Sequence, residues 1–371
     1  MTVNFNNLSL QNNKISTKSL KKIKALISDS SFILGDAVAQ FENNFKNYIG
    51  CKFAVGVNSG TDAIKLACRS LDLKGDTIIF IPANTYIATY TGAYEAYPDA
   101  FFEFVDCDDF YQIDLKDLEQ KINKNKNFTN KVVIPVHLYG HTSDMKNLLK
   151  LKSKYNFHIV EDCSQAHGAI NNLNKKVGTT GTVNAFSLYP GKNLGALGDA
   201  GIITTDSEDV YKKLLALRNI GSVAKYIHDE FGYNSRLDSI QAIFLDEKLK
   251  LLDNFNRKRI KIAKRFCSEI NNSFISLPEK SKYCKKHVYH LFVIKTDFRD
   301  ALKEYLSKNG IQTFIHYPRP VYDNDYLLKY KIKCKNVDEN SGRILSLPMH
   351  PFLKNEEISF IIDKLNKFNN E

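Results

Sequence analysis

The stretch SLYPGKNLGALGDAGIITTD, residues 187–206, decides the fold of this chain. It holds a single lysine, Lys192, in a run too rich in glycine for a helix interior and too interrupted for a long strand. Lys192 follows the apolar segment 184–188, which we expect to be a strand. A solvated surface lysine is the simplest interpretation of such a residue. Its role therefore depends on what else the chain brings to the same turn.

Length, composition and charge describe an ordinary globular protein. The chain has 371 residues, enough for two domains, with 43% hydrophobic and 25% charged residues. The formal net charge of +11 suggests attraction to anionic molecules, but the lysines are scattered and form no basic block or tail. We therefore expect an anionic small molecule as the partner, and no nucleic acid.

Cysteine spacing and the lack of long apolar segments indicate the compartment. The seven cysteines lie far apart and include no CxxC pair, which is typical of reduced thiols and not of a metal site. The N-terminus is polar and lacks the apolar core of a signal peptide, and no stretch has the length of a membrane span. We expect a soluble, cytoplasmic protein with no metal and no membrane contact.

Short apolar segments alternate with helical patterns over the first two thirds of the chain. Strands are predicted at 53–57, 77–81, 101–105, 132–136, 158–160, 184–188 and 201–205, with helices such as 145–155 between several of them. This alternation predicts an α/β fold with a mostly parallel sheet. Ligands of such sheets bind at the carboxyl ends of the strands.

The pattern changes after residue 257 and predicts a smaller α+β domain. Its predicted elements are helices at 258–273, 299–309 and 356–368, and strands at 288–294, 312–316 and 343–347. We therefore predict a large domain over residues 1–254 and a small C-terminal domain over 255–371. The asparagine- and lysine-rich segment 121–131 is expected to be a surface loop.

Three further features follow predicted strands. Glu161 and Asp162 come directly after the strand 158–160, where a carboxylate such as Asp162 either caps the next turn or faces a bound cation. The run NSGTD at 58–62 either caps a helix or offers backbone N–H groups to a phosphate. Tyr86, in PANTY at 82–86, either packs in a loop or lies against a planar ring.

An amine, a carboxylate, a flat aromatic ring and a phosphate cradle together describe one cofactor, pyridoxal 5'-phosphate. Its aldehyde forms a Schiff base with a lysine, and its pyridinium nitrogen needs an acidic partner to stay protonated. The protonated ring then accepts electrons from the substrate carbon. The order and strand-end placement of the four features, more than any one of them, predict this cofactor.

The sequence resembles the DegT/DnrJ/EryC1/StrS family of sugar aminotransferases, a branch of the aspartate-aminotransferase fold (fold type I). The resemblance covers nearly the whole chain and rests on motifs in the family order. These are FILG at 32–35, NSGTD at 58–62, PANTY at 82–86, HLYG at 137–140, EDCSQAHG at 161–168, the lysine segment 187–198, GYNSRLD at 232–238 and IHYP at 315–318.

The resemblance implies roles for the cofactor residues. Lys192 would form the Schiff base and move the proton as general acid and base, and Asp162 would pair with the pyridinium nitrogen. Gln165 and Tyr86 would lie against the ring or its hydroxyl side. The phosphate would be held by Gly60, Thr61, Asp62 and Ser187, helped by Asn234 of a neighbouring subunit. Such a contact implies a homodimer with active sites completed across the interface.

The resemblance also implies the substrates. L-Glutamate would give its amino group to the cofactor, and the aminated cofactor would then aminate a keto sugar carried on a nucleotide. YPGKNLGALGD around Lys192 resembles members acting at C3 of dTDP-linked 6-deoxy-3-ketohexoses, so the expected product is a dTDP-3-amino-3,6-dideoxyhexose of fucose or quinovose type for surface glycans such as the lipopolysaccharide O antigen. The matching substrate positions, each of which could instead be packed or solvated, are Tyr189, His167, Lys225, His316 and Tyr317.

Three alternatives share the fold. A deoxygenating dehydratase carries histidine in place of Lys192, which argues against it. A non-catalytic regulator or DNA-binding relative would not need Lys192 and Asp162 together. A 4-aminotransferase acting on a dTDP-, UDP- or GDP-4-keto-6-deoxyhexose shares every cofactor residue named above and stays open.

Overall fold

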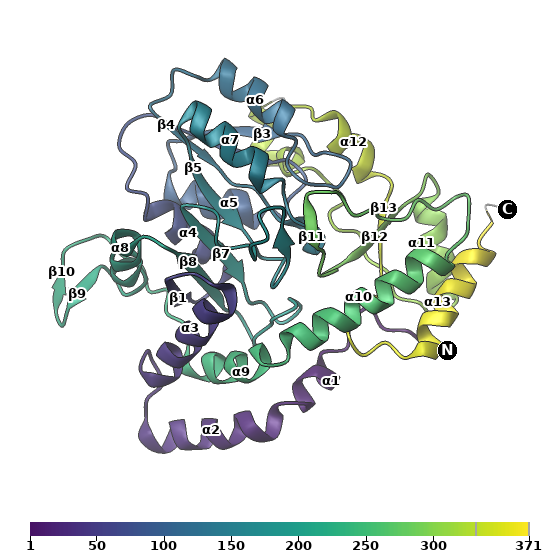
Figure 1. The fold of residues 1–371 in the computed structure, drawn as a ribbon, viewed down its shortest axis with the longest axis horizontal. Helices are drawn as coiled ribbons and strands as arrows, with labels where there is room; N and C mark the ends of the chain where they lie inside the picture. Colours follow the sequence, from purple (N-terminus) through teal and green to yellow (C-terminus); the bar gives the residue numbers. More distant parts are fainter. Residues whose placement is uncertain (331, 370–371) are drawn as a thin grey trace.

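The computed structural model describes residues 1–330 and 332–369, and a seven-stranded sheet forms its centre (Figure 1). The spatial order of the strands is β1 (Phe53–Val57), β8 (Gly201–Thr205), β7 (Val183–Ser187), β5 (His158–Asp162), β4 (Asn130–Val133), β2 (Thr77–Pro82) and β3 (Phe101–Val105). Only β8 runs against its neighbours, and the other pairs in the sheet are parallel. The predicted α/β fold with a mostly parallel sheet is confirmed.

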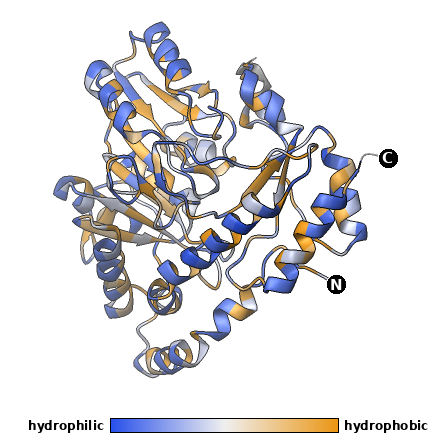
Figure 2. Ribbon diagram, turned by 45° about the vertical axis from the view of Figure 1, so that its right-hand side comes forward, coloured by the Kyte–Doolittle hydropathy of each residue, from blue (hydrophilic) through white to orange (hydrophobic). Residues whose placement is uncertain are grey.

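Successive side chains of the strands point to opposite faces of the sheet, and helices pack against them on both faces. In β2, Ile79 and Ile81 belong to one apolar core, whereas Ile78 and Phe80 belong to another. The first face is covered by α4 (Gly60–Arg69), α5 (Ala88–Ala96) and α8 (Glu208–Arg218), and the second by α3 (Asp36–Ile49), α6 (Leu115–Lys124), α7 (Met145–Tyr155) and α9 (Ser239–Leu249). Figure 2 shows the apolar strands between helices with hydrophilic outer faces.

The C-terminal elements form an apolar core of their own, apart from those of the large sheet. The strands β12 (Phe292–Lys295) and β13 (Ile344–Leu347) pair antiparallel, and the helices are α10 (Leu252–Glu269), α11 (Arg299–Lys308) and α13 (Asn355–Lys367). Val3 of the N-terminus joins this core, whereas Val321 and Val337 pack on the core of the large sheet. The predicted division after residue 254 falls inside α10 and stays a prediction.

The remaining elements are short or lie at the periphery. Helix α2 (Ser16–Asp29) packs against α9. The set comprises α1 (Leu8–Asn13), α2 (Ser16–Asp29), α12 (Lys335–Ser341), the antiparallel pairs β6 (Ile170–Asn171) with β11 (Cys284–Lys286) and β9 (Ser222–Ala224) with β10 (Ile227–His228), and three 3-10 turns at Leu138–Gly140, Val321–Asp323 and Asp325–Tyr330. None of the helices in the described ranges is long and apolar enough to cross a membrane.

Two local predictions are wrong. Residues 312–316 form no strand, because the backbone of Gln312 pairs with Val3 while Phe314 pairs with Ser346, so the segment divides its hydrogen bonds between two partners. The segment 121–131 is not one loop either. Helix α6 continues to Lys124, since its apolar face buries Ile122, and β4 begins at Asn130.

Candidate active site

A cavity of about 510 Å³ opens at the carboxyl ends of β1, β2, β5 and β7. These four strands run in the same direction, so their ends meet at one edge of the sheet. Most of the residues predicted from the sequence line it, namely Gly60, Thr61, Tyr86, Asp162, Gln165, Ser187, Tyr189, Lys192, His316 and Tyr317. The structure thus brings together side chains that lie up to 257 residues apart in the sequence, a span that runs from Gly60 to Tyr317.

Four predicted residues do not line the cavity. Asp62 forms an ion pair with Lys65, with 2.6 Å between Oδ1 and Nζ. His167 is fully buried, and neither of its ring nitrogens has a partner among the described residues. Lys225 and Asn234 are exposed on the surface. The roles of all four stay predictions.

Lys192 lies in a turn that several buried side chains hold. Its backbone N–H donates to the Tyr189 carbonyl at 2.9 Å. The next residue, Asn193, donates to Asn256 Oδ1 at 2.9 Å, and the Lys248 ammonium donates to the Gly195 carbonyl at 2.9 Å. Burial lowers the pKa of Lys192 to about 8, although the Asp162 carboxylate acts to raise it. The amine is therefore available as a base near neutral pH.

The Asp162 carboxylate faces the cavity and is held at both oxygens. The hydroxyl of Thr89 donates to Oδ2 at 2.8 Å, and the backbone N–H of Ser164 donates to Oδ1 at 3.1 Å. Thr85 in turn bonds the Thr89 hydroxyl at 2.8 Å. These bonds fix the position of the Asp162 side chain at the cavity wall, where it can face the ring nitrogen of a bound cofactor.

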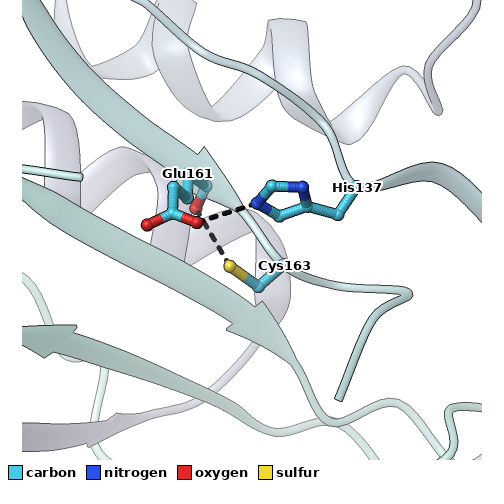
Figure 3. A group of neighbouring side chains, drawn as sticks. All are labelled: His137, Glu161 and Cys163. Carbon is cyan, nitrogen blue, oxygen red and sulfur yellow. Dashed lines mark hydrogen bonds and ion pairs between the residues drawn. The ribbon is translucent and has the colours of Figure 1, made fainter. Parts of the chain in front are cut away.

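Glu161, the neighbour of Asp162, points away from the cavity into a buried network (Figure 3). His137 Nδ1 accepts from the Ser143 N–H at 3.0 Å, so its Nε2–H donates to Glu161, at 2.8 Å. The N–H groups of residues 178, 180 and 181 also donate to Glu161, at 2.6–3.2 Å. Cys163 completes a trio of potential metal ligands. Because these donors occupy both the imidazole and the carboxylate, we interpret the trio as structural.

Gln165 joins the cavity wall to the C-terminal part of the chain. Its amide donates to the Tyr317 hydroxyl at 3.0 Å, and its oxygen accepts from the Tyr139 N–H at 2.7 Å. The ring of Tyr317 lies 5.3 Å from that of Tyr86, which is 53% exposed. His316 bonds Ser346 Oγ through Nδ1 at 2.9 Å, and burial lowers its pKa to about 4. A planar ligand would therefore meet neutral aromatic and amide groups here.

The opposite wall is the N-terminus of α4. Ser59 caps this helix by accepting from the Asp62 N–H at 3.1 Å, and the helix begins at Gly60. A Cβ built on Gly60 would lie 2.4 Å from Ser187 Cβ, so only glycine fits this close approach of β7. The first N–H groups of a helix have no intrahelical acceptor and favour an anion.

These groups fit pyridoxal phosphate. Ser187 and the first turn of α4 would hold its phosphate, Asp162 its ring nitrogen, Gln165 and Tyr86 its ring, and Lys192 its aldehyde. When bound, the cofactor supplies an electron-accepting ring that the side chains lack.

Sequence reasoning missed several residues of this site. Thr89 and Ser164 orient Asp162, and Arg259, His290 and Phe5 line the cavity. The signal for Ser164 was present, because it lies inside the motif EDCSQAHG. Nothing in the sequence marks Thr89 or Arg259, whose positions follow from packing.

The chain is similar to known aminotransferases over nearly its whole length. The chain is 38% identical over 341 residues, 91% of each chain, to dTDP-3-amino-3,6-dideoxy-alpha-D-galactopyranose transaminase of Aneurinibacillus thermoaerophilus. It is 37% identical, over 92% of this chain and 91% of the relative, to UDP-N-acetyl-3-dehydro-alpha-D-glucosamine 3-aminotransferase of Acidithiobacillus ferrooxidans. It is also 33% identical, over 99% of both chains, to a protein of Geobacillus stearothermophilus named pleiotropic regulatory protein.

Solved structures share the whole fold. DesV of S. venezuelae, in complex with a ketimine intermediate, matches with a TM-score of 0.93 at 34% identity, over 99% of this chain and 98% of that one. NtdA of Bacillus subtilis, with bound cofactor PMP, matches with a TM-score of 0.88 at 27% identity, over 98% and 84%. The model of the DegT/DnrJ/EryC1/StrS aminotransferase family matches residues 13–366. The chain belongs to this family of sugar aminotransferases.

Proposed function

We propose that this enzyme moves the amino group of L-glutamate to the C3 ketone of a dTDP-linked 3-keto-6-deoxyhexose. The product is a dTDP-3-amino-3,6-dideoxyhexose, a building block of surface glycans. The observation that carries the proposal is the cavity in which the Lys192 amine, with a pKa of about 8, shares the wall with the Asp162 carboxylate.

Each side chain has its own role in the proposed reaction. Lys192 takes a proton from the carbon that bears the amino group of glutamate and returns one to C3 of the sugar. Asp162, fixed by Thr89 and Ser164, keeps a negative charge against the cofactor ring. Tyr317 and His316 close the side of the cavity that the C-terminal part supplies.

The relatives support position C3 of the sugar more strongly than they support the dTDP carrier. Both aminotransferase relatives described above are named for C3 of the sugar, and they differ in the nucleotide. The relative with the dTDP sugar and the motif around Lys192 favour dTDP and a 6-deoxyhexose. A regulatory role without catalysis would leave the lowered pKa of Lys192 and the held carboxylate of Asp162 without a purpose.

The proposal includes a homodimer in the cytoplasm. All seven cysteines are free thiols, as expected in a reducing compartment. Asn234 is exposed, and the neighbouring β9–β10 segment exposes Val223, Tyr226, Ile227 and Phe231 by 51–85%. Such a group of apolar side chains favours a protein partner, here a second copy of the chain.

Two half-reactions measured by stopped-flow absorbance test the proposal. L-Glutamate should bleach the yellow colour of the pyridoxal form, and a dTDP-3-keto-6-deoxyhexose should restore it. The matched controls are the corresponding dTDP-4-keto sugar and a UDP-linked 3-keto sugar. Bleaching that only the 4-keto sugar reverses would replace C3 by C4, and no bleaching by glutamate would remove the donor.

A further inference from the structure

Arg259 is a buried cation whose charge no carboxylate of the described residues balances. It lies on the long helix α10 (Figure 1), whose Leu252 packs in a core of the large sheet and whose Ile262 packs in the C-terminal core, and it is 2% exposed. It lines the same cavity as Lys192. Burial lowers the pKa of Arg259 to about 9, and no nearby carboxylate acts to raise it. Burying an unpaired charge is costly, so a group that is kept buried and unpaired points to a missing partner.

All the hydrogen bonds that Arg259 donates to the described residues come from one nitrogen of its guanidinium, Nη1. Nη1 donates to the carbonyls of Met349 at 2.5 Å, His290 at 3.3 Å and Tyr289 at 3.4 Å. Nε is buried and has no partner among the described residues. A guanidinium presents five N–H donors in a fixed fork. The three carbonyls therefore fix the plane of the group and leave another edge for an acceptor.

The surroundings of Arg259 favour an anion. His290 also lines the cavity, and its Nδ1 bonds Asn193 Oδ1 at 3.1 Å, beside Lys192. The pKa of His290 lies well below its usual value because of burial and the positive charges of Lys192 and Arg259. A neutral imidazole thus lies in the field of both cations. A planar, two-oxygen anion matches a guanidinium edge in this field.

We propose that Arg259 binds a carboxylate of the amino-acid donor and so holds the donor next to Lys192. The inference rests on the proposed function, because only an aminotransferase needs such a donor. A carboxylate on the acceptor sugar would offer the same chemistry. The donor is favoured because the proposed 6-deoxyhexose carries no carboxylate.

The test measures the two half-reactions separately in the variants Arg259→Gln and Arg259→Lys. Arg257→Gln, on the exposed side of the same helix, is the matched control. We expect the glutamate concentration at half-maximal bleaching to rise about 10- to 100-fold in Arg259→Gln, the size of a lost hydrogen bond to a charged group. Arg259→Lys should lose part of this affinity. The sugar half-reaction, started from the pyridoxamine form, should change less than about threefold in both.

A binding measurement gives a readout besides activity. Calorimetry should detect glutarate binding to the unaltered protein and to Arg257→Gln, and at least about tenfold weaker binding to Arg259→Gln. Glutaramide, the uncharged analogue, should not bind. Equal glutarate affinity in the Arg259 variants would overturn the proposal.

Other outcomes overturn it in distinguishable ways. Loss of the sugar half-reaction alone would assign Arg259 to the acceptor, and loss of bound cofactor would assign it to the cofactor phosphate. Failure of glutamate to bleach the unaltered enzyme would refute the proposed donor first. If the variants do not fold, crystals of the unaltered protein soaked in glutarate decide. A carboxylate on the free edge of Arg259 supports the proposal, and one elsewhere in the cavity overturns it.

Discussion

The amine of Lys192 can act as a base near neutral pH because burial lowers its pKa to about 8. The pKa of an ordinary lysine is about 10.4. We predict that Lys192→Ala lowers kcat by more than about 10³-fold and leaves the circular dichroism spectrum unchanged. The exposed Lys175→Ala serves as the control. A rate for Lys192→Ala within tenfold of the control would contradict the assignment.

The same pKa predicts how pH affects cofactor capture. Only the neutral amine attacks an aldehyde, so the rate at which cofactor-free protein takes up pyridoxal phosphate should rise with pH and level off above about 8. Asp162 acts to raise this pKa, so Asp162→Asn should move the midpoint to lower pH. Stopped-flow absorbance follows the uptake. A midpoint near that of an ordinary lysine would show that the amine is not buried in the free protein.

Thr89 is predicted to be a positioning residue, because its hydroxyl donates to Asp162 and so acts through that carboxylate. Removing its 2.8 Å hydrogen bond in Thr89→Val should lower kcat by roughly 10- to 100-fold, the equivalent of one bond to a charged group. Thr89→Ser, which keeps the hydroxyl, should restore most of the rate. Thr91→Val on the same helix is the control. Equal rates in the Val and Ser variants would remove this role.

Some residues of the site can be predicted from the sequence alone, and others cannot. Lys192 and Asp162 could be predicted because Asp162 lies at the end of β5 and Lys192 in the turn after β7, and the strand order brings these ends to one edge. Thr89 lies 73 residues before its partner Asp162, and no local pattern links the two. The motif around His167 predicts a place near the substrate; its ring lies 5.4 Å from that of Phe186, and its role stays a prediction.

At the scale of elements, Glu161 fixes the end of β5 to the loop before β7. Burial acts to raise the pKa of Glu161, but bonds from His137 and the loop N–H groups outweigh it and lower the pKa. The ionised group therefore stabilises the fold above its unfolded pKa of about 4.3, and this stability is lost as the pH falls.

This network predicts the effect of an isosteric change. In Glu161→Gln an amide donor would face other donors, so the free energy of unfolding should fall by about 2–4 kcal/mol. Urea unfolding measures it. Glu119→Gln removes an exposed ion pair between α6 and α7 and should cost clearly less, because water screens an exposed pair. Similar losses in the two variants would mean that the buried network does not stabilise the end of β5.

Elements with a buried apolar pattern were predicted almost to the residue. β1, β3, β8 and α7 have the expected bounds because their apolar residues face a core. The predicted strand 312–316 failed because its backbone partners, Val3 and Ser346, lie about 310 and 32 residues away along the chain, and the pattern of one segment carries no information about them.

At the scale of the molecule, the β9–β10 segment leaves apolar side chains exposed, with Tyr226 85% and Phe231 75% accessible. If they lie in a dimer interface, Phe231→Glu should produce monomers, since burying a charge without a partner is costly. Light scattering during size-exclusion chromatography measures the mass. Lys175→Glu, at an exposed polar position, should leave the mass unchanged. A dimer in both variants would place the interface elsewhere.

Whether two subunits share an active site can be tested by mixing inactive chains. Asn234 is exposed and does not line the cavity of its own chain, so we predict that it serves the site of the partner. Lys192→Ala and Asn234→Ala, each inactive or weak alone, should regain up to about one quarter of the full activity after joint refolding, because half of the dimers are mixed and each then has one intact site. Joint refolding of Lys192→Ala with Asp162→Asn is the control and should stay inactive, since both residues come from one chain. No recovery in either mixture would confine each active site to a single subunit, and recovery in the control mixture would show that Lys192 and Asp162 do not act in the same chain.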